Sequence, residues 1–144
     1  MIQRIQTLFF LLAAIGFGVL FFLPFATSDV AINGLFEDSI YQIGDHIALQ
    51  LITALGVLLS VLAIFMYRHR SNQIKTGIGA TTMAILLPIV AVLIYMNDPV
   101  TSSDTTIEDH AGLYVPIVVV VCALLAVRFV RKDDKLVKSM DRLR

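Results

Sequence analysis

The sequence predicts an all-α membrane protein, a four-helix up-down-up-down transmembrane bundle with a C-terminal cytoplasmic amphipathic helix. Of the 144 residues, 58% are apolar and 15% are charged, whereas a soluble domain has about 45–50% apolar and about 25% charged residues. Four stretches without ionisable side chains are long enough to cross a bilayer. The basic residues lie before the first of these stretches, between the second and the third, and after the fourth. An ordinary water-soluble enzyme is excluded, and residues 1–144 form a single membrane domain.

The predicted spans cover about residues 7–26, 47–67, 76–96 and 111–130. A helix rises about 1.5 Å per residue, so about 20 residues cross the roughly 30 Å hydrocarbon core. The fourth uncharged stretch ends at Val127 and reaches full length if the long side chain of Arg128 extends to the interface. The first apolar run is longer than the about 7–15 residues of a signal-peptide core, so we expect it to be retained as a helix.

The charged residues are segregated. The loops 27–46 and 97–110 carry four acidic residues each and no Lys or Arg. The basic residues lie in the N-terminal segment, in the loop after the second span, at the end of the fourth span and in the tail, residues 131–144. Because short cytoplasmic loops retain Lys and Arg, this pattern predicts that both termini are cytoplasmic.

The first outer loop contains the signals of a small hairpin. Residues 30–32 and 35–36 are apolar and flank Asn33-Gly34, a pair that suits a type I′ turn. Ile40, Tyr41 and Ile43 follow, and we expect these apolar side chains to cover the outer ends of the helices. A docking patch for another protein is the alternative interpretation.

Two groups of residues inside the spans predict helix packing. Polar side chains recur at helical spacing on the second span, and small residues recur on the first and third. We expect interhelical hydrogen bonds from the polar group, with a polar conduit as the alternative, and close helix contacts, within the bundle or to a partner helix, from the small group. These residues are Gln50, Thr53 and Ser60, and Ala14, Gly18, Gly77, Ala80 and Ala84.

An Asp-His pair precedes both the second and the fourth span, at Asp45-His46 and Asp109-His110. Two histidines with carboxylates at the outer surface form a candidate site for Zn²⁺ or another divalent ion, or a pH-sensitive cluster. The alternative is structural: each Asp caps a helix whose N-terminal dipole favours negative charge. The spacing is non-local, so the sequence leaves both interpretations open.

The tail continues the fourth span, directly or after a bend, as an amphipathic helix with Leu136, Val137, Met140 and Leu143 on one face. Its basic residues are expected to contact anionic lipid headgroups or to dock against a cytoplasmic partner. The mixture of acidic and basic residues is not typical of a nucleic-acid interface. The basic residues concerned are Arg131, Lys132, Lys135, Lys138 and Arg142.

The two cytoplasmic segments carry a resemblance. Residues 1–7 (MIQRIQT), 128–137 (RFVRKDDKLV) and 139–144 (SMDRLR) are similar to those of a bacterial family of small four-span membrane proteins of unknown function. This resemblance implies a location in the bacterial inner membrane and carries over no catalytic residue.

No nucleophile motif, phosphate-binding loop or dinucleotide turn occurs in the sequence. We therefore expect a non-enzymatic protein without a cofactor, an accessory, assembly or scaffold subunit of a larger membrane complex. Its expected partners are the lipid bilayer and another membrane protein or further copies of the chain. The alternatives are a small oligomeric transporter or channel, and an outer-surface metal-binding or pH-sensing module.

Overall fold

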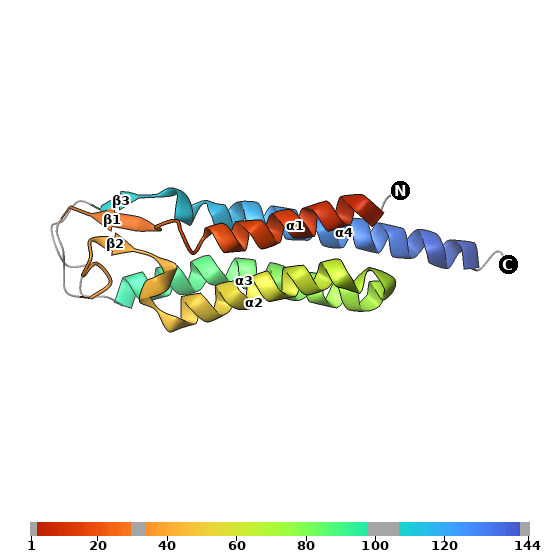
Figure 1. Cartoon of the computed structure of the whole chain (residues 1–144), viewed down its shortest axis with the longest axis horizontal. Coiled ribbons are helices and arrows are strands. Elements are labelled where there is room, and N and C mark those ends of the chain that lie inside the picture. Colours follow the sequence, from red (N-terminus) through yellow and green to blue (C-terminus); the bar gives the residue numbers. More distant parts are fainter. Residues whose placement is uncertain (1–2, 30–33, 98–106, 142–144) are drawn as a thin grey trace.

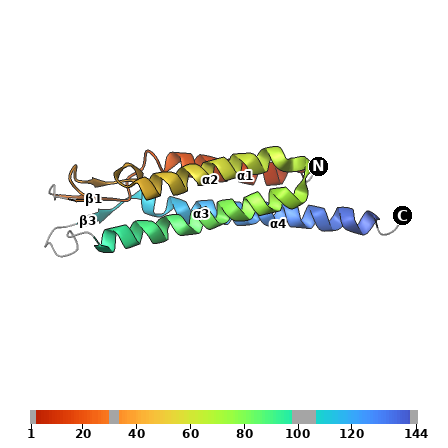
Figure 2. The same cartoon turned by 90° about the horizontal axis from the view of Figure 1, so that it is seen from below.

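The computed structural model describes residues 3–29, 34–97 and 107–141. Four α-helices lie side by side, and both termini lie at one end of the molecule (Figure 1). Each helix packs mainly against two neighbours, α1 and α3 each lying between α2 and α4. A small sheet lies at the end opposite the termini in both views (Figures 1 and 2). The helices are α1 (Gln3–Val19), α2 (Ile47–Phe65), α3 (Arg70–Asn97) and α4 (Val115–Asp141).

Three helical segments are long and apolar enough to cross a membrane, which indicates an integral membrane protein. They are Ile47–Arg68, Arg70–Asn97 and Ala111–Ser139. The first includes the short 3-10 helix η2 (Met66–Arg68), and the third includes η4 (Ala111–Leu113). The fourth span continues into the tail as one unbroken helix to Asp141. The predicted second, third and fourth spans all fall within these three segments.

The predicted outer end of the first span is wrong. The helix α1 ends at Val19 rather than near residue 26, and its apolar part, Ile5–Val19, is shorter than the three spanning segments. Pro24 has no backbone N–H and disfavours helical geometry in the residue before it. The next residue, Phe25, donates its backbone N–H to the carbonyl of Tyr41 at 2.7 Å. The chain therefore leaves the helix early and enters the sheet.

The sheet has three short antiparallel strands in the order β2-β1-β3. In this sheet Ala26 of β1 pairs with Tyr41 of β2 and with Asp109 of β3. The predicted hairpin around Asn33-Gly34 lies largely outside the described residues, because residues 30–33 are not among them. The pairing that the structure describes joins residues 26–27 to 40–41 and residues 26–28 to 107–109. The strands are β1 (Ala26–Ser28), β2 (Ile40–Tyr41) and β3 (Ile107–Asp109).

The outer loop covers the ends of the helices, as the sequence predicted. Tyr41 and Ile43 are buried, and the hydroxyl of Tyr41 donates to the backbone carbonyl of Ala91 on α3 at 2.9 Å. Its ring also packs against Phe25 and Phe36. Ile40 is the exception: it precedes Tyr41 in the strand, points to the opposite face and is exposed.

Large apolar side chains fill the centre of the bundle. The innermost are fully buried and come from all four helices, among them Phe10, Phe17, Leu49, Leu87 and Val119. Glycines let the helices approach: a Cβ on Gly16 would lie 2.5 Å from Val119, and one on Gly77 would lie 2.7 Å from Val127. The helices therefore pack closely at points where an aromatic or branched side chain of one helix contacts a glycine of another.

Candidate functional site

Two of the three polar side chains predicted to bond between helices bond within their own helix. Thr53 donates to the carbonyl of Leu49 at 2.7 Å, and Ser60 donates to the carbonyl of Gly56 at 2.8 Å. Both side chains are buried in the apolar interior, and these bonds give each hydroxyl the partner that a buried polar group needs. The amide of Gln50 donates to the carbonyl of Gly44 just outside α2 at 2.7 Å.

The predicted small-residue faces are only partly used. On α3, Gly77, Ala80 and Ala84 are all buried, and Gly77 lies against Phe10 of α1 and Val127 of α4. On α1, Ala14 is buried, but nothing would lie within 4 Å of a Cβ on Gly18. The glycines of α1 and α2 that make close contacts are Gly16 and Gly56, which the spacing did not single out.

The two Asp-His pairs make separate structural contacts. The Nδ1 of His46 accepts from the backbone N–H of Ala48 at 3.2 Å and so caps α2. The Nε2 of His110 lies 2.8 Å from the Oγ1 of Thr27. Within residues 3–29, 34–97 and 107–141, no three His, Cys, Asp or Glu residues form a group that could hold a metal ion. The structure therefore does not bring His46, His110 and their carboxylates together as one site.

The carboxylates of these pairs also have local roles. Asp45 accepts from the backbone N–H of Gln42 at 2.7 Å, which closes the short helix η1 (Ile43–Asp45). Asp109 lies in β3 opposite Ala26. Partial burial raises the pKa of the Asp45 carboxyl above its usual 3.8, the hydrogen bond from Gln42 opposes this shift, and the nearby carboxylate of Asp38 adds to it.

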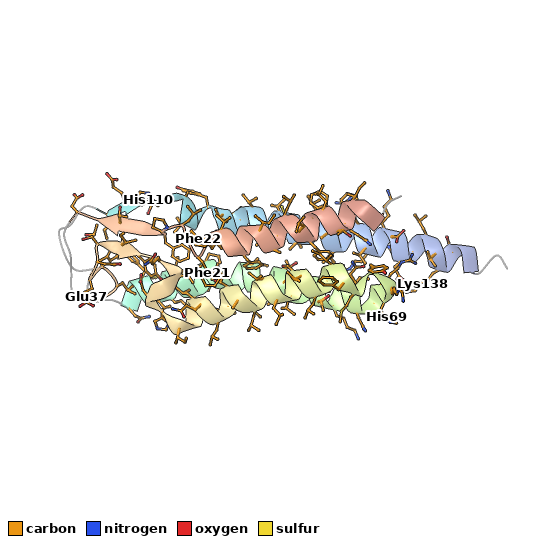
Figure 3. All side chains as sticks on the ribbon, in the orientation of Figure 1. Phe21, Phe22, Glu37, His69, His110 and Lys138 are labelled. Atoms are coloured by element: carbon orange, nitrogen blue, oxygen red, sulfur yellow. The ribbon has the colours of Figure 1, made fainter. Side chains whose placement is uncertain are left out.

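The labelled charged residues lie at opposite ends of the molecule. Glu37 lies at the end that holds the strands, and Lys138 lies at the end that holds the termini; each end also has a histidine, His110 and His69 (Figure 3). Two salt bridges link charged residues at this second end: Arg70 at the start of α3 lies 3.3 Å from Asp133 of α4, and Lys138 lies 2.6 Å from Asp134.

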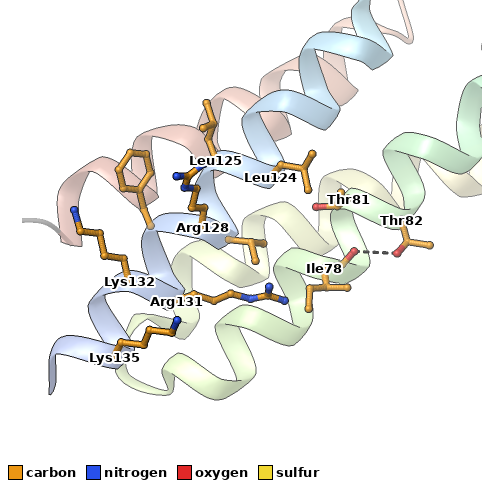
Figure 4. A pocket seen from close by; sticks show the side chains of 11 residues that line it. Ile78, Thr81, Thr82, Leu124, Leu125, Arg128, Arg131, Lys132 and Lys135 are labelled. Atoms are coloured by element: carbon orange, nitrogen blue, oxygen red, sulfur yellow. Dashed lines mark hydrogen bonds between the residues drawn. The ribbon is translucent and has the colours of Figure 1, made fainter. Parts of the chain in front are cut away.

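A groove of about 1060 Å³ lies between α3 and α4 at the basic end of the bundle (Figure 4). Its α3 wall consists of Ile78, Thr81 and Thr82. Both threonine hydroxyls donate to carbonyls of α3 itself, at 2.9 Å for Thr81 and 3.0 Å for Thr82. This wall therefore offers methyl groups and no free donor.

The α4 side of the groove carries the positive charge. Arg131, Lys132 and Lys135, three of the five predicted contact residues, line it together with Arg128. Of the other two, Lys138 is paired with Asp134, and Arg142 lies outside the described residues. The apolar lining on this side comes from Leu124, Leu125, Val127 and Phe129.

The α4 side of the groove follows from local sequence, and its basic residues other than Arg128 were predicted. Leu124, Arg128, Arg131 and Lys135 recur every three or four residues and therefore share one face of α4. This spacing is visible in the sequence. The contribution of α3 is not, because it depends on which helix packs beside α4.

Gln73 of α3 is a structural residue that the sequence did not single out. Its side chain is fully buried, and its amide donates to the carbonyl of Ala63 at 2.9 Å. Ala63 lies in the last turn of α2, where carbonyls lack the N–H of a following turn. Gln73 therefore ties the start of α3 to the end of α2.

These features define an integral membrane helix bundle with a small sheet covering one end and a basic groove at the end that holds the termini. Residues 2–143 match the sequence profile of a protein family described as "Domain of unknown function (DUF4293)". The chain belongs to this family, which confirms the resemblance to an uncharacterised family. No curated protein and no solved structure matches the chain.

Proposed function

We propose that this protein is a multi-pass protein of the bacterial inner membrane with both termini in the cytoplasm. The helices α1 to α4 cross in up-down-up-down order, and the end of α4 forms an amphipathic cytoplasmic helix. The charge distribution supports this orientation. Among the described residues, Lys and Arg occur only near the start of α1, in η2, near the start of α3 and in the second half of α4. These segments lie at the end that holds the termini (Figure 1).

Within the membrane, we assign the protein a non-enzymatic role as an accessory, assembly or scaffold subunit of a larger complex. The observation that carries this proposal is the contrast between the interior and the exterior of the bundle. The interior is filled by apolar side chains, and its hydroxyls are bonded within their own helices. In the most apolar 18-residue stretch of each of the three spanning segments, only 28–33% is buried within the bundle. Most of the spanning surface is therefore available to lipid or to partner helices.

The two alternatives receive less support. A transporter or channel lined by Gln50, Thr53, Ser60 and Thr81 needs polar groups that face a path. The three hydroxyls are instead buried and bonded within their own helices. An outer-surface metal site needs converging ligands, and the described histidines make separate contacts. Neither arrangement offers a centre for transport or metal chemistry.

Gentle extraction followed by native sizing tests the assembly role. We expect the protein to migrate with another membrane protein, and cross-linking through residues on the exposed faces should capture that protein. Recovery of a lone 15.9 kDa chain in every mild detergent contradicts the proposal. Assemblies that contain only copies of this chain support a homo-oligomer instead.

Cysteine labelling tests the orientation separately. The single native cysteine, Cys122, is first replaced by serine, and one cysteine is then placed at Glu37 or at Ser139. A membrane-impermeant maleimide is expected to label the Glu37→Cys variant in intact cells and the Ser139→Cys variant only after lysis. The reverse pattern contradicts the topology.

A further inference from the structure

We propose that the groove between α3 and α4 binds one anionic phospholipid of the cytoplasmic leaflet. The phosphate lies among Arg128, Arg131, Lys132 and Lys135, and an acyl chain lies along Ile78 and Leu124. This inference rests on the membrane orientation proposed above but not on the assembly role. It names a ligand for a defined site, which differs from general attraction of a basic tail to a charged membrane.

The position of the groove fits the border between lipid and water. On α3, Lys75 is the last charged residue before the uncharged part of the helix, and Ile78 lies about one turn further along. On α4, the uncharged part ends at Val127, and Arg128 is the first basic residue. The groove therefore has its apolar part just inside the hydrocarbon and its basic part at headgroup level.

The size of the groove fits a lipid rather than a small ion. Small-molecule sites commonly have volumes of about 300–1,000 Å³, and this groove has about 1060 Å³. An inorganic anion would occupy the basic end alone and leave the wall of Ile78, Thr82 and Leu124 uncovered (Figure 4). A headgroup joined to an acyl chain covers both parts.

The charge of the groove is not neutralised by the aspartates of the tail. Asp133 pairs with Arg70, and Asp134 pairs with Lys138. Throughout the part of the chain that the structure describes, no salt bridge involves the four basic residues of the groove. Arginine guanidinium groups bind phosphate oxygens in a fork geometry, and lysines add point charges. The groove thus selects a lipid with net negative charge over a zwitterionic one.

The wild-type protein provides the first test. Purified protein in a neutral detergent is titrated with dioleoyl phosphatidylglycerol or dioleoyl phosphatidylcholine, and bound lipid is counted by native mass spectrometry. We expect one phosphatidylglycerol to remain bound at concentrations where phosphatidylcholine does not. Equal binding of the two lipids overturns the proposal, as does binding of phosphatidylglycerol in a graded series without a preferred first molecule.

Paired charge variants locate the site. Arg131→Gln with Lys135→Gln removes one arginine and one lysine from the groove, and Arg68→Gln with Lys75→Gln removes the same charges outside it. Each basic residue near an anionic lipid contributes about 1 kcal/mol, so we expect the groove pair to weaken phosphatidylglycerol binding about 30-fold. The control pair should change it less than about threefold. Equal losses for both pairs overturn the assignment to the groove.

A wall variant separates a lipid site from a free-phosphate site. Ile78→Trp fills the apolar part and keeps all four charges, and Ile85→Trp is the control on the same helix, where the side chain is also exposed but does not line the groove. Only Ile78→Trp should abolish the preferred phosphatidylglycerol. Displacement of that lipid by millimolar inorganic phosphate, or unchanged lipid binding by Ile78→Trp, overturns the proposal.

Circular dichroism checks whether each variant keeps its helices. The comparison of the two lipids on the wild-type protein does not depend on any variant. Because these measurements use purified protein, they do not depend on a partner protein. A failure of the lipid proposal is therefore distinguishable from a failure of the assembly role or of the topology.

Discussion

The ring of Phe17 on α1 occupies the place where a side chain on Gly56 of α2 would lie. A Cβ built on Gly56 would be 2.5 Å from both Cε1 and Cζ of that ring. Phe17 is fully buried, so the ring has no free space into which it can move. This contact sets how closely the first two helices approach.

We predict that Gly56→Ala destabilises the bundle by about 1–3 kcal/mol, because an added methyl overpacks the contact with Phe17. Gly18→Ala is the matched control, since nothing lies within 4 Å of its Cβ. Alanine favours a helix more than glycine, so the control should be neutral or up to about 1 kcal/mol more stable. Unfolding in mixed micelles, followed by circular dichroism, measures both. Equal effects would contradict the observed packing.

The bond between Gln73 and the end of α2 gives a second prediction. Gln73→Leu removes the donor to the buried carbonyl of Ala63, and we expect a loss of about 1–3 kcal/mol in the free energy of unfolding. Gln50→Leu removes a similar bond to Gly44 that is exposed, and it should cost less than half as much. The same unfolding assay compares them, and a larger loss for Gln50→Leu would contradict the prediction.

The two salt bridges at the basic end predict unequal coupling energies. The pair Arg70–Asp133 links α3 to α4 and is largely covered, with side-chain exposures of 23% and 13%. The pair Lys138–Asp134 lies within α4, and its lysine is 71% exposed. Surface pairs contribute about 0–1 kcal/mol.

Double-mutant cycles with Arg70→Gln and Asp133→Asn, and with Lys138→Gln and Asp134→Asn, measure the two couplings. We expect about 1 kcal/mol for the first pair and less than about 0.5 kcal/mol for the second. Added salt should weaken the second coupling more, since exposed charges are screened more strongly. A stronger coupling in the exposed pair would show that the link between α3 and α4 is not maintained.

Asp45 predicts a pH dependence of stability. Its pKa is raised in the folded protein above 3.8, so the folded state binds this proton more tightly than the unfolded state. The contribution of Asp45 to the free energy of unfolding therefore falls as the pH rises from 3.8 through the raised pKa, and it is constant above that range.

Asp45→Asn should remove this fall and keep an acceptor for the N–H of Gln42. Asp38→Asn should reduce the fall only in part, because the Asp38 carboxylate is one of several causes of the shift. Thermal unfolding in detergent between pH 3.5 and 7 measures the slopes in all three proteins. A steeper loss of stability in the Asp45→Asn variant would contradict the sign of the shift.

The sequence predicts those parts of the fold that depend on long uncharged stretches. The apolar signal is summed over about 20 residues, so the second, third and fourth spans were found. The outer end of the first span was predicted too far along the chain. The helix ends at Val19, ahead of Pro24, and the pairing of Phe25 with Tyr41 that follows joins residues distant in sequence. The pairing of β1 with β2 and β3 was not predicted, because strands of two or three residues are too short to show an alternating pattern.

Prediction of the candidate site was limited by helix pairing. The basic residues Arg131, Lys132 and Lys135 were recognised from their charge, but the wall formed by Ile78 and Thr82 depends on which helix lies beside α4. The same limit applies to Gly56, because a glycine in an apolar run does not reveal which ring will face it. The sequence predicts which residues of one helix are charged or apolar, but it does not predict which side chains of another helix they will contact.

The helix α4 has 27 residues without a break, so it is about 40 Å long and exceeds the roughly 30 Å hydrocarbon core. Figure 1 shows its end projecting past the neighbouring helices. This helix begins next to the end of the molecule that holds the strands and continues beyond the other three helices as one element. Because no helix break separates Val115 from Asp141, a change in the direction of the projecting end changes the direction of the whole helix unless the helix bends.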